Sequence, residues 1–257
     1  MNRGDEMSVL FSLAEKTAIV TGGSTGLGAS MAMGLAEAGA DIVLVDHRER
    51  KETASAIQGL GRRVLQVVGD LSDRRFPGAI VSKTVEAFGK VDILVNNAGI
   101  IRRTPVLDFT EKDWDDVMEV NARSVFFLCQ AAARDMAKRK KGKIINIASL
   151  LSFQGGITVP SYAASKGAVA QVTKALANEL GKEGINVNAI APGYMETANT
   201  EQLRKNPDRF RQISERIPAG RWGVPDDLKG AVVYLSSPAS DYVNGHVLVV
   251  DGGWMAR

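Results

Sequence analysis

The chain has 257 residues, of which 45 % are hydrophobic and 24 % are charged. The hydrophobic fraction is that of an ordinary globular protein and excludes a disordered chain, and no apolar run approaches the ~18 residues of a membrane-spanning helix. The 32 basic and 29 acidic residues give a net charge of only +3, so neither a nucleic acid nor a membrane is an expected partner.

The N-terminus and the single cysteine bear on the cellular compartment. Residues 1–8 place acidic groups before a short apolar run, which is unlike a signal peptide, and we expect them to be flexible. Cys129 lies in the apolar run SVFFLCQAAA, which is typical of a packed thiol in a reducing compartment. We therefore expect a cytoplasmic protein without internal disulfides.

From residue 9 onward, short apolar runs alternate with longer helical patterns. The expected strands are residues 17–21, 41–46, 63–68, 91–96, 143–148, 185–190 and 246–251, and the expected helices are residues 26–39, 77–89, 112–139, 162–184 and 225–237. Most of the strands are apolar throughout, a pattern typical of parallel strands that are buried on both faces. The sequence therefore predicts a single α/β domain over residues 9–257, a doubly wound parallel sheet of the Rossmann type that binds ligands at the carboxyl ends of its strands.

One segment interrupts this alternation. Residues 194–223 lie between an expected strand and the next expected helix, and only their middle has a weak helical pattern. Segments of this length are uncommon in compact domains unless they form lids or binding loops. We predict that residues 194–223 form a substrate lid.

Glycines follow the first expected strand in the stretch TGGSTGLG. Gly22, Gly26 and Gly28 lie where the strand turns into a helix, and glycine permits both positive φ angles and a close approach of the backbone to a ligand. The N-terminus of a helix also offers free N–H groups to an anion. The stretch predicts a site for the pyrophosphate of a dinucleotide, and a purely structural turn is the alternative.

The second expected strand ends in Asp46. A carboxylate at this place accepts hydrogen bonds from the adenosine ribose and repels a 2′-phosphate, which favours NAD over NADP. The uncharged Thr25 agrees with this prediction, because the glycine turn then offers no cation to a phosphate. Arg48 follows two residues after Asp46 and keeps NADP as the alternative.

A tyrosine and a lysine are spaced for contact in the stretch SYAASKGAVA. Tyr162 and Lys166 are four residues apart and share one face of the expected helix. The pKa of a free tyrosine is about 10, and a nearby ammonium group lowers that pKa toward the range of a general acid or base. Ser149 ends the preceding strand and can donate a hydrogen bond to a substrate oxygen, with Ser152 and Ser161 as alternatives.

Motifs along most of the chain resemble those of the short-chain dehydrogenase/reductase family. The resemblance covers residues 11–257 and is carried by TGGSTGLG (21–28), GDLSD (69–73), NNAG (96–99), Asn121, Ser149, YAASK (162–166), APGYMET (191–197) and VDGG (250–253). It implies an enzyme that moves a hydride to or from an alcohol carbon. The implied catalytic residues are Asn121, Ser149, Tyr162 and Lys166, and Asn121 would support a water in a proton relay.

The same resemblance implies which residues hold the cofactor. The residues are Gly22, Ser24, Thr25, Gly26, Leu27 and Gly28 around the glycine turn, Asp46 at the adenosine ribose, Asp70 and Leu71 at the adenine, Asn97, Ala98 and Gly99 after the fourth strand, Gly193, Met195 and Thr197 at the nicotinamide, and Tyr162 with Lys166 at the nicotinamide ribose. The cofactor expected from the residues is NAD rather than NADP, and no metal is expected.

A narrower resemblance concerns the substrate. Stretches such as KIINIASLLSFQGG, RIPAGRWG and VDGGWMAR are similar to those of bacterial dehydrogenases that interconvert 2-dehydro-3-deoxy-D-gluconate and its 5-oxo form in the breakdown of pectin and other uronate polysaccharides. This resemblance implies a sugar-acid substrate and a homotetramer, with the apolar tail around Trp254 in the core or at a subunit contact. A sugar acid needs a cation for its carboxylate and polar groups for its hydroxyls. The candidates are Ser149, Arg102 or Arg103, Gln154, Tyr194, Met195 and Arg204.

Three other functions compete with a sugar-acid dehydrogenase of this type. A gluconate 5-dehydrogenase and an NADPH-dependent 3-oxoacyl carrier-protein reductase are the alternative enzymes, and Asp46 together with Thr25 speaks against the second. A nucleotide-binding protein without activity is the alternative outside the enzymes. The complete set of Asn, Ser, Tyr and Lys speaks against it, because a binding module needs no proton relay.

Overall fold

Seven parallel strands form one sheet in the computed structural model, which describes residues 9–257. The strands are β1 (Thr17–Thr21), β2 (Asp41–Asp46), β3 (Val64–Val68), β4 (Ile93–Asn96), β5 (Gly142–Ile147), β6 (Ile185–Pro192) and β7 (Val247–Val250). Two of the predicted strands have the predicted bounds, and the others differ by at most two residues at either end. The expectation of a flexible segment over residues 1–8 lies outside the described residues.

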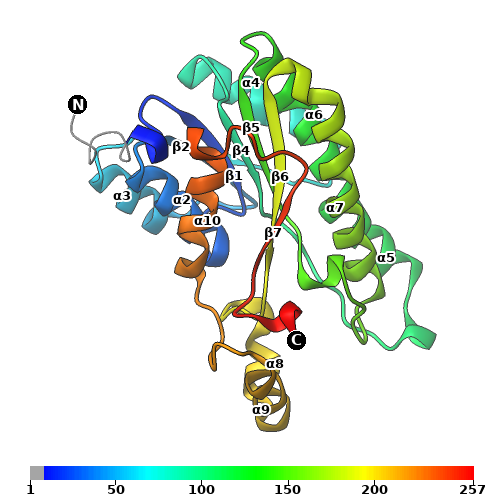
Figure 1. Ribbon diagram of the computed structural model, residues 1–257. Coiled ribbons are helices and arrows are strands. Elements are labelled where there is room, and N and C mark those ends of the chain that lie inside the picture. The colour runs from blue at the N-terminus through cyan, green and yellow to red at the C-terminus, as the bar shows by residue number, and fades with distance from the viewer. Residues whose placement is uncertain (1–8) are drawn as a thin grey trace.

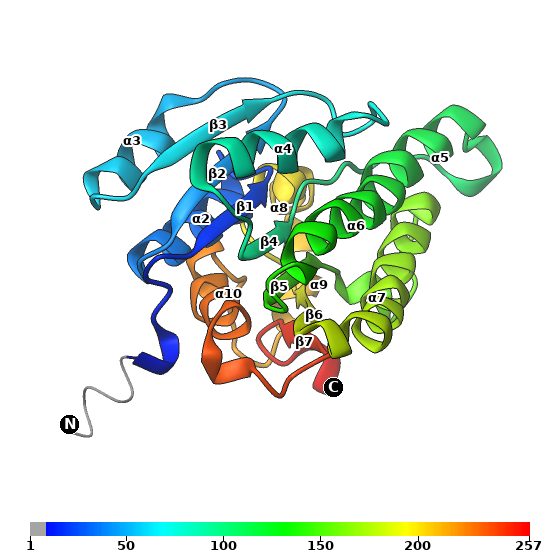
Figure 2. The same cartoon turned by 90° about the horizontal axis from the view of Figure 1, so that it is seen from above.

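Helices cover both faces of the sheet, as expected for a doubly wound fold (Figure 2). One face carries α2 (Gly26–Glu37), α3 (Lys51–Gly59) and α10 (Lys229–Ser236), and the other carries α4 (Phe76–Phe88), α6 (Ser124–Ala137) and α7 (Pro160–Leu180), with α5 (Glu111–Met118) preceding α6. Each face has its own apolar cluster. The predicted Rossmann-type single domain is confirmed.

Helix α3 was missed by the sequence patterns. Only Thr53, Ala54 and Ile57 of its nine residues are buried, so the apolar stripe is too thin to stand out in the sequence. The thiol of Cys129 on α6 is fully buried, and burial raises its pKa to about 12, which confirms the prediction of a packed thiol.

The order of the strands places a crevice near the middle of the sheet. The order is β3-β2-β1-β4-β5-β6-β7, so the chain winds outward from β1 in one direction and from β4 in the other. Between β1 and β4, where the direction of winding changes, the connections after the two strands diverge and leave room for a ligand beyond the carboxyl ends of the strands. These ends face the α8 and α9 region in Figure 1.

The segment predicted as a lid contains α8 (Glu201–Lys205) and α9 (Pro207–Arg216), so its weak helical pattern is confirmed. Figure 1 shows both helices beyond the sheet, beside the C-terminus. The two ends of the segment are joined by a short parallel bridge between Met195 and Gly223. Its inner side packs in an apolar cluster with the tail, made of Leu150, Ile213, Ile217, Trp222 and Trp254.

Candidate active site

The glycine turn joins β1 to α2 in a conformation that needs glycine. Gly22 and Gly26 have φ angles of +62° and +54°, in the left-handed region where a side chain is strained. A Cβ atom at Gly28 would overlap the carbonyl oxygen of Gly22. The turn therefore brings its backbone close to the start of α2, whose first N–H groups have no partners within the helix.

The end of β4 is tied to this turn. The side chain of Asn97 donates to the carbonyl oxygen of Thr21 at 2.9 Å, and the Thr21 hydroxyl accepts from the backbone N–H groups of Asn97 and Ala98 at 3.0 Å. These bonds hold the two strand ends on either side of the crevice in a fixed relation.

Asp46 at the end of β2 is held by Ser24. The backbone N–H and the hydroxyl of Ser24 both donate to Oδ2 of Asp46, at 3.0 and 2.6 Å. Burial raises the pKa of this carboxyl above its usual value, and the Ser24 bonds act in the opposite direction. The other oxygen, Oδ1, makes no hydrogen bond within residues 9–257, and Asp46 lines the same cavity as the glycine turn.

A cavity of about 400 Å³ brings together most of the predicted cofactor residues. They are Gly22, Thr25, Gly26, Leu27, Asp46, Leu71, Asn97, Ala98, Gly99, Tyr162, Lys166 and Thr197. The sequence reasoning missed Val45, His47, Gly69, Ile100, Val120, Ile147, Ala198 and Asn199 in the same wall. Several of these directly follow a strand or a predicted motif, which is the signal that could have found them.

Five predicted cofactor residues do not line this cavity. Ser24 and Gly28 shape the turn from behind, Asp70 lies in an adjoining open depression, and Gly193 lines the neighbouring cavity described below. Met195 differs most from its prediction. Its side chain is buried against Gly223 in the core and lines neither cavity, because the backbone bridge turns it away from the crevice.

The cavity suits a dinucleotide. Three features follow one another along its wall. They are a glycine cradle that Cβ atoms would fill, a helix N-terminus for a pyrophosphate and a carboxylate for ribose hydroxyls. The residues that would hold NAD or NADP are thus already in place around the crevice.

Tyr162 and Lys166 lie one turn apart on α7, as predicted. The Lys166 ammonium lies 5.6 Å from the centre of the Tyr162 ring and donates to the carbonyl oxygen of Ile147 at 2.6 Å. Burial lowers the pKa of Lys166 to about 8. The expected drop in the Tyr162 pKa is wrong for this structure: burial raises that pKa, the Ser149 hydroxyl and the Arg103 charge lower it less, and Lys166 makes no resolved contribution.

Ser149 is separated from its two alternatives by the structure. Its hydroxyl lies at the N-cap of a short 3-10 turn, η3 (Leu150–Ser152), and faces a second cavity together with Tyr162. The Ser152 hydroxyl instead donates to the carbonyl oxygen of Lys166 at 2.7 Å, which ties this turn to α7. Ser161 is fully buried and lines neither cavity.

Asn121 lies in a π-helical turn, η2 (Glu119–Arg123), that interrupts the single helix predicted over residues 112–139. Its amide accepts from the N–H of Ile100 and donates to the carbonyl oxygen of the same residue, both at 2.8 Å, and donates to the Ser165 hydroxyl at 3.2 Å. Such turns recur at functional sites because they redirect a side chain out of the helical repeat. Here the turn aims Asn121 at the loop after β4 and at α7.

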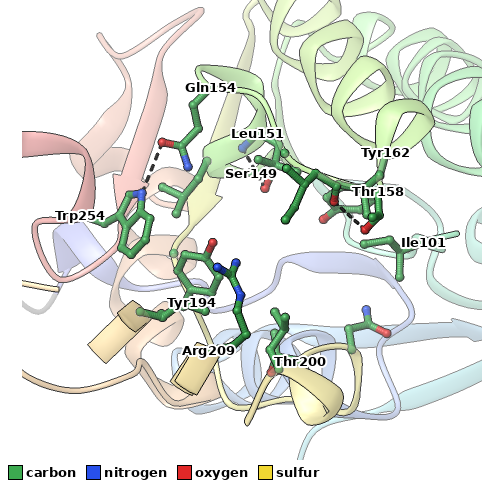
Figure 3. A pocket seen from close by; sticks show the side chains of 18 of the residues that line it. Ile101, Ser149, Leu151, Gln154, Thr158, Tyr162, Tyr194, Thr200, Arg209 and Trp254 are labelled. Atoms are coloured by element: carbon green, nitrogen blue, oxygen red, sulfur yellow. Dashed lines mark hydrogen bonds between the residues drawn. The ribbon is translucent and has the colours of Figure 1, made fainter. Parts of the chain in front are cut away.

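The second cavity has a volume of about 620 Å³ and lies between η3, the start of α7 and the segment 194–223 (Figure 3). Ser149, Arg103, Gln154 and Tyr194 line it, so four of the substrate candidates come together. The sequence reasoning missed other lining residues, among them Ile101, Leu151, Thr158, Arg209, Gln212 and Arg216. Tyr162 and Asn199 line both cavities and therefore stand at their junction.

The remaining substrate candidates lie elsewhere. Arg102 forms ion pairs with Asp113 and Asp116 on α5, and Arg204 donates to the carbonyl oxygen of Thr197. Neither lines the second cavity. Sequence distance from a motif does not distinguish them from Arg103, because the direction of each side chain depends on the fold of its loop.

Aromatic rings back the wall of this cavity. Trp254 is buried and lies 4.7 Å from Tyr194 between ring centres, and its indole N–H donates to the side-chain oxygen of Gln154 at 3.3 Å. Tyr194 also contacts Trp222, which stacks on Phe210 of α9. The tail residue Trp254 thus belongs to the core of this chain, one of its two predicted places.

Residues 9–257 hold neither a cluster of metal-binding side chains nor a membrane-spanning helix. Among residues 9–257, no group of three or more His, Cys, Asp and Glu side chains is placed to hold a metal ion. No helix in that range is both long and apolar enough to cross a membrane.

Fold and site together define an oxidoreductase that uses a nicotinamide dinucleotide. A family model described as enoyl-(acyl carrier protein) reductase matches residues 22–255. The chain belongs to the short-chain dehydrogenase/reductase family, and the family predicted from the motifs is confirmed.

Relatives and solved structures cover nearly the whole chain. The 2-dehydro-3-deoxy-D-gluconate 5-dehydrogenases of Dickeya dadantii and Escherichia coli are 60 % and 58 % identical, and each alignment covers 96 % of this chain and 98 % of the relative. A crystal structure of an Agrobacterium tumefaciens protein assigned as a 2-deoxy-D-gluconate 3-dehydrogenase, with bound NADP, is 53 % identical with a TM-score of 0.91, and covers 96 % of this chain and 99 % of that one.

Proposed function

We propose that this protein is an NAD(P)-dependent dehydrogenase of a sugar acid, acting on 2-dehydro-3-deoxy-D-gluconate and its 5-oxo form. The observation that carries the proposal is the position of Tyr162, whose side chain lines both the cofactor cavity and the second cavity. A phenol at that junction can reach a hydroxyl that lies against the cofactor. The names of the relatives with 60 % and 58 % identity support the choice of substrate.

The chain's own residues supply proton transfer and positioning. When bound, the nicotinamide cofactor is the hydride donor or acceptor. Tyr162 gives or takes the proton of the substrate oxygen, and the Ser149 hydroxyl donates a hydrogen bond to that oxygen while charge develops on it. Lys166 holds a positive charge behind the phenol, and Asn121 supports the path of the proton toward solvent through the loop after β4.

The test of this assignment is Tyr162→Phe. We expect kcat to fall by about 10²–10⁴-fold, because the proton-transfer group is lost while the ring still fills its place. The binding of NADH, followed by its fluorescence, should be unchanged. Tyr242→Phe is the matched control, since Tyr242 is fully exposed. Retained turnover in Tyr162→Phe would remove the tyrosine from the mechanism.

The substrate is tested with a panel. NADH and NADPH oxidation is measured with 5-oxo sugar acids, among them 5-keto-D-gluconate, with neutral keto sugars and with 3-oxoacyl thioesters. Turnover of sugar acids alone supports the proposal, and the preferred acid distinguishes it from a gluconate 5-dehydrogenase. Turnover of thioesters alone would identify a carrier-protein reductase, and no turnover across the panel would favour a nucleotide-binding protein.

For the cofactor we propose a preference for NAD. Asp46 lines the cavity and its Oδ1 atom has no partner within residues 9–257, so this carboxylate can accept from ribose hydroxyls and would repel a 2′-phosphate. The Agrobacterium relative was solved with NADP, so the preference has to be measured. We expect kcat/KM to be at least tenfold higher with NADH than with NADPH, a difference that Asp46→Asn should reduce. Equal efficiencies in the unaltered protein would overturn the preference.

The assembly, the compartment and the lid are further parts of the proposal. We propose a cytoplasmic homotetramer that acts in the breakdown of uronate polysaccharides, which the family resemblance and the single buried thiol support. Light scattering should then give four times the chain mass of 27.5 kDa.

We propose that residues 194–223 act as the substrate lid, because Tyr194, Arg209 and Arg216 from this segment line the second cavity.

A further inference from the structure

The charged residues around the second cavity are all of one sign. Arg103, Arg209 and Arg216 line it, and no Asp, Glu, Lys or His side chain from the described residues does. None of the three arginines forms an ion pair within residues 9–257, although sixteen such contacts occur elsewhere in that range. A cavity with three arginines and no acid favours an anionic ligand.

The three arginines lie in two places. Arg103 follows β4 and is close enough to Tyr162 for its charge to lower the pKa of that phenol, and it donates to the carbonyl oxygen of Asn199 at 3.0 Å. Arg209 and Arg216 both belong to α9 and both act on the pKa of Tyr194 instead. One cation thus lies at the reacting end of the cavity and two lie at the end formed by the lid.

Arg209 and Arg216 share a face of α9. They are seven residues apart, which is close to two helical turns. Figure 3 shows the Arg209 side chain rising from the lid toward Tyr194 and into the cavity. The Arg209 side chain has one hydrogen bond within residues 9–257, to Gln212 beside it at 3.1 Å, and the Arg216 guanidinium stacks on Trp254 at 4.0 Å from the ring centre. Both guanidinium groups therefore keep free N–H donors for a ligand.

The position of the reacting carbon places the carboxylate at the opposite end of the substrate. In a six-carbon acid that reacts at C5, four carbon–carbon bonds separate the reacting carbon from the carboxylate at C1. With C5 at Tyr162, the carboxylate lies away from the phenol, on the side of the cavity formed by the lid. An arginine fork is the side chain best suited to a carboxylate, because it presents two parallel N–H donors.

We propose that Arg209, supported by Arg216, binds the C1 carboxylate of the substrate, and that α9 thereby makes the enzyme specific for acids over neutral sugars. This inference rests on the proposed function and deepens it. Arg103 lies near the reacting end and is left to contact the hydroxyls there. The lid helix then closes on the substrate through the group that distinguishes a sugar acid from a sugar.

The experiment compares 2-dehydro-3-deoxy-D-gluconate with its neutral C1 amide. In Arg209→Met we expect KM for the acid to rise by about 10- to 100-fold, the effect of losing one charged hydrogen bond, with kcat nearly unchanged and KM for the amide unaltered. Arg216→Met should show a smaller effect in the same direction. Arg209→Lys should restore part of the preference for the acid, because it keeps the charge and loses the fork.

Arg211→Met is the matched control. Arg211 lies on the same helix, does not line the cavity and pairs with Asp208 at the surface, so its removal should leave both KM values unchanged. A KM for the acid that does not change in Arg209→Met would overturn the inference. Equal increases for the acid and the amide would also overturn it, because they would show a loosened lid rather than a lost carboxylate contact.

A binding measurement separates this inference from the proposed function. Calorimetry of the acid and the amide is carried out with Tyr162→Phe saturated with NAD, alone and combined with Arg209→Met. Tighter binding of the acid that depends on Arg209 supports the inference even if the unaltered enzyme turns over neither compound, an outcome in which the proposed function fails. Equal binding of the acid and the amide contradicts the inference even if turnover is normal.

Discussion

Lys166 carries a charge in a place where charges are costly. It is 5 % exposed, its ammonium has a backbone carbonyl as its hydrogen-bond acceptor, and no carboxylate within residues 9–257 pairs with it. Burial of an unpaired charge opposes folding, which is why its pKa falls to about 8. The molecule keeps a lysine there at a cost in stability, as expected for a residue that serves chemistry rather than packing.

The titration of Lys166 gives a prediction for stability. Between its folded pKa of about 8 and its unfolded value near 10.5, the unfolded chain binds more protons, so stability rises with pH in this window. We expect Lys166→Met to be more stable than the unaltered protein at pH 7. The difference between their free energies of unfolding should narrow by about 2 kcal/mol between pH 8 and pH 10. Urea unfolding of both proteins at several pH values measures this difference. A gap that stays constant with pH would show that Lys166 does not titrate in this range.

Single residues were the level at which sequence reasoning was least complete. The spacing of Tyr162 and Lys166 was readable, because a helix has a fixed repeat. The direction of the shift in the Tyr162 pKa was not, because it depends on how deeply the fold buries the phenol. Arg209 was missed for a similar reason: nothing in its neighbourhood along the chain distinguishes it from the solvated Arg211.

At the scale of elements, the turn between β1 and α2 depends on two glycines for different reasons. Gly26 needs its positive φ angle but has open space around the position of a Cβ atom. Gly28 has ordinary helical geometry but no space, since a Cβ atom would overlap the carbonyl oxygen of Gly22. One glycine is required by conformation and the other by packing.

This difference predicts unequal effects of alanine. Gly26→Ala should lower the free energy of unfolding by about 1 kcal/mol, the cost of the left-handed conformation. Gly28→Ala should lower it by about 3 kcal/mol and should also weaken NADH binding, because the overlap pushes the turn away from the cofactor cavity. Denaturation and fluorescence titration measure the two effects. Equal losses in both variants would contradict the distinction.

Elements were predictable where burial left a strong pattern. The bounds of the strands could be predicted within two residues because most strands are apolar throughout. Helix α3 was missed because it buries so few residues. The helix over residues 112–139 was expected as one piece, and the π-helical turn at Asn121 breaks it. No propensity marks such a turn, since it is stabilised by the bonds between Asn121 and Ile100 from another part of the chain.

At the scale of the whole molecule, two cavities meet at Tyr162. The cofactor cavity is built mainly from residues near the carboxyl ends of β1 to β5, whereas the second cavity depends largely on the segment 194–223 and on the tail. The first could be predicted well, because its residues follow strands in a regular way. The second could not, because its walls come from a segment without a repeating pattern.

The bridge between Met195 and Gly223 has a consequence for how such a protein can change. It holds both ends of the intervening segment at one place, and the chain then continues through α10 to β7, which completes the sheet beside β6. The chain therefore enters and leaves this segment at one place, and between these ends the segment packs against the tail through Ile213, Ile217 and Trp254. New specificity can arise by exchanging the residues from Leu203 to Arg216 that line the second cavity, while the glycine turn, Tyr162 and Lys166 lie outside the segment and can stay the same.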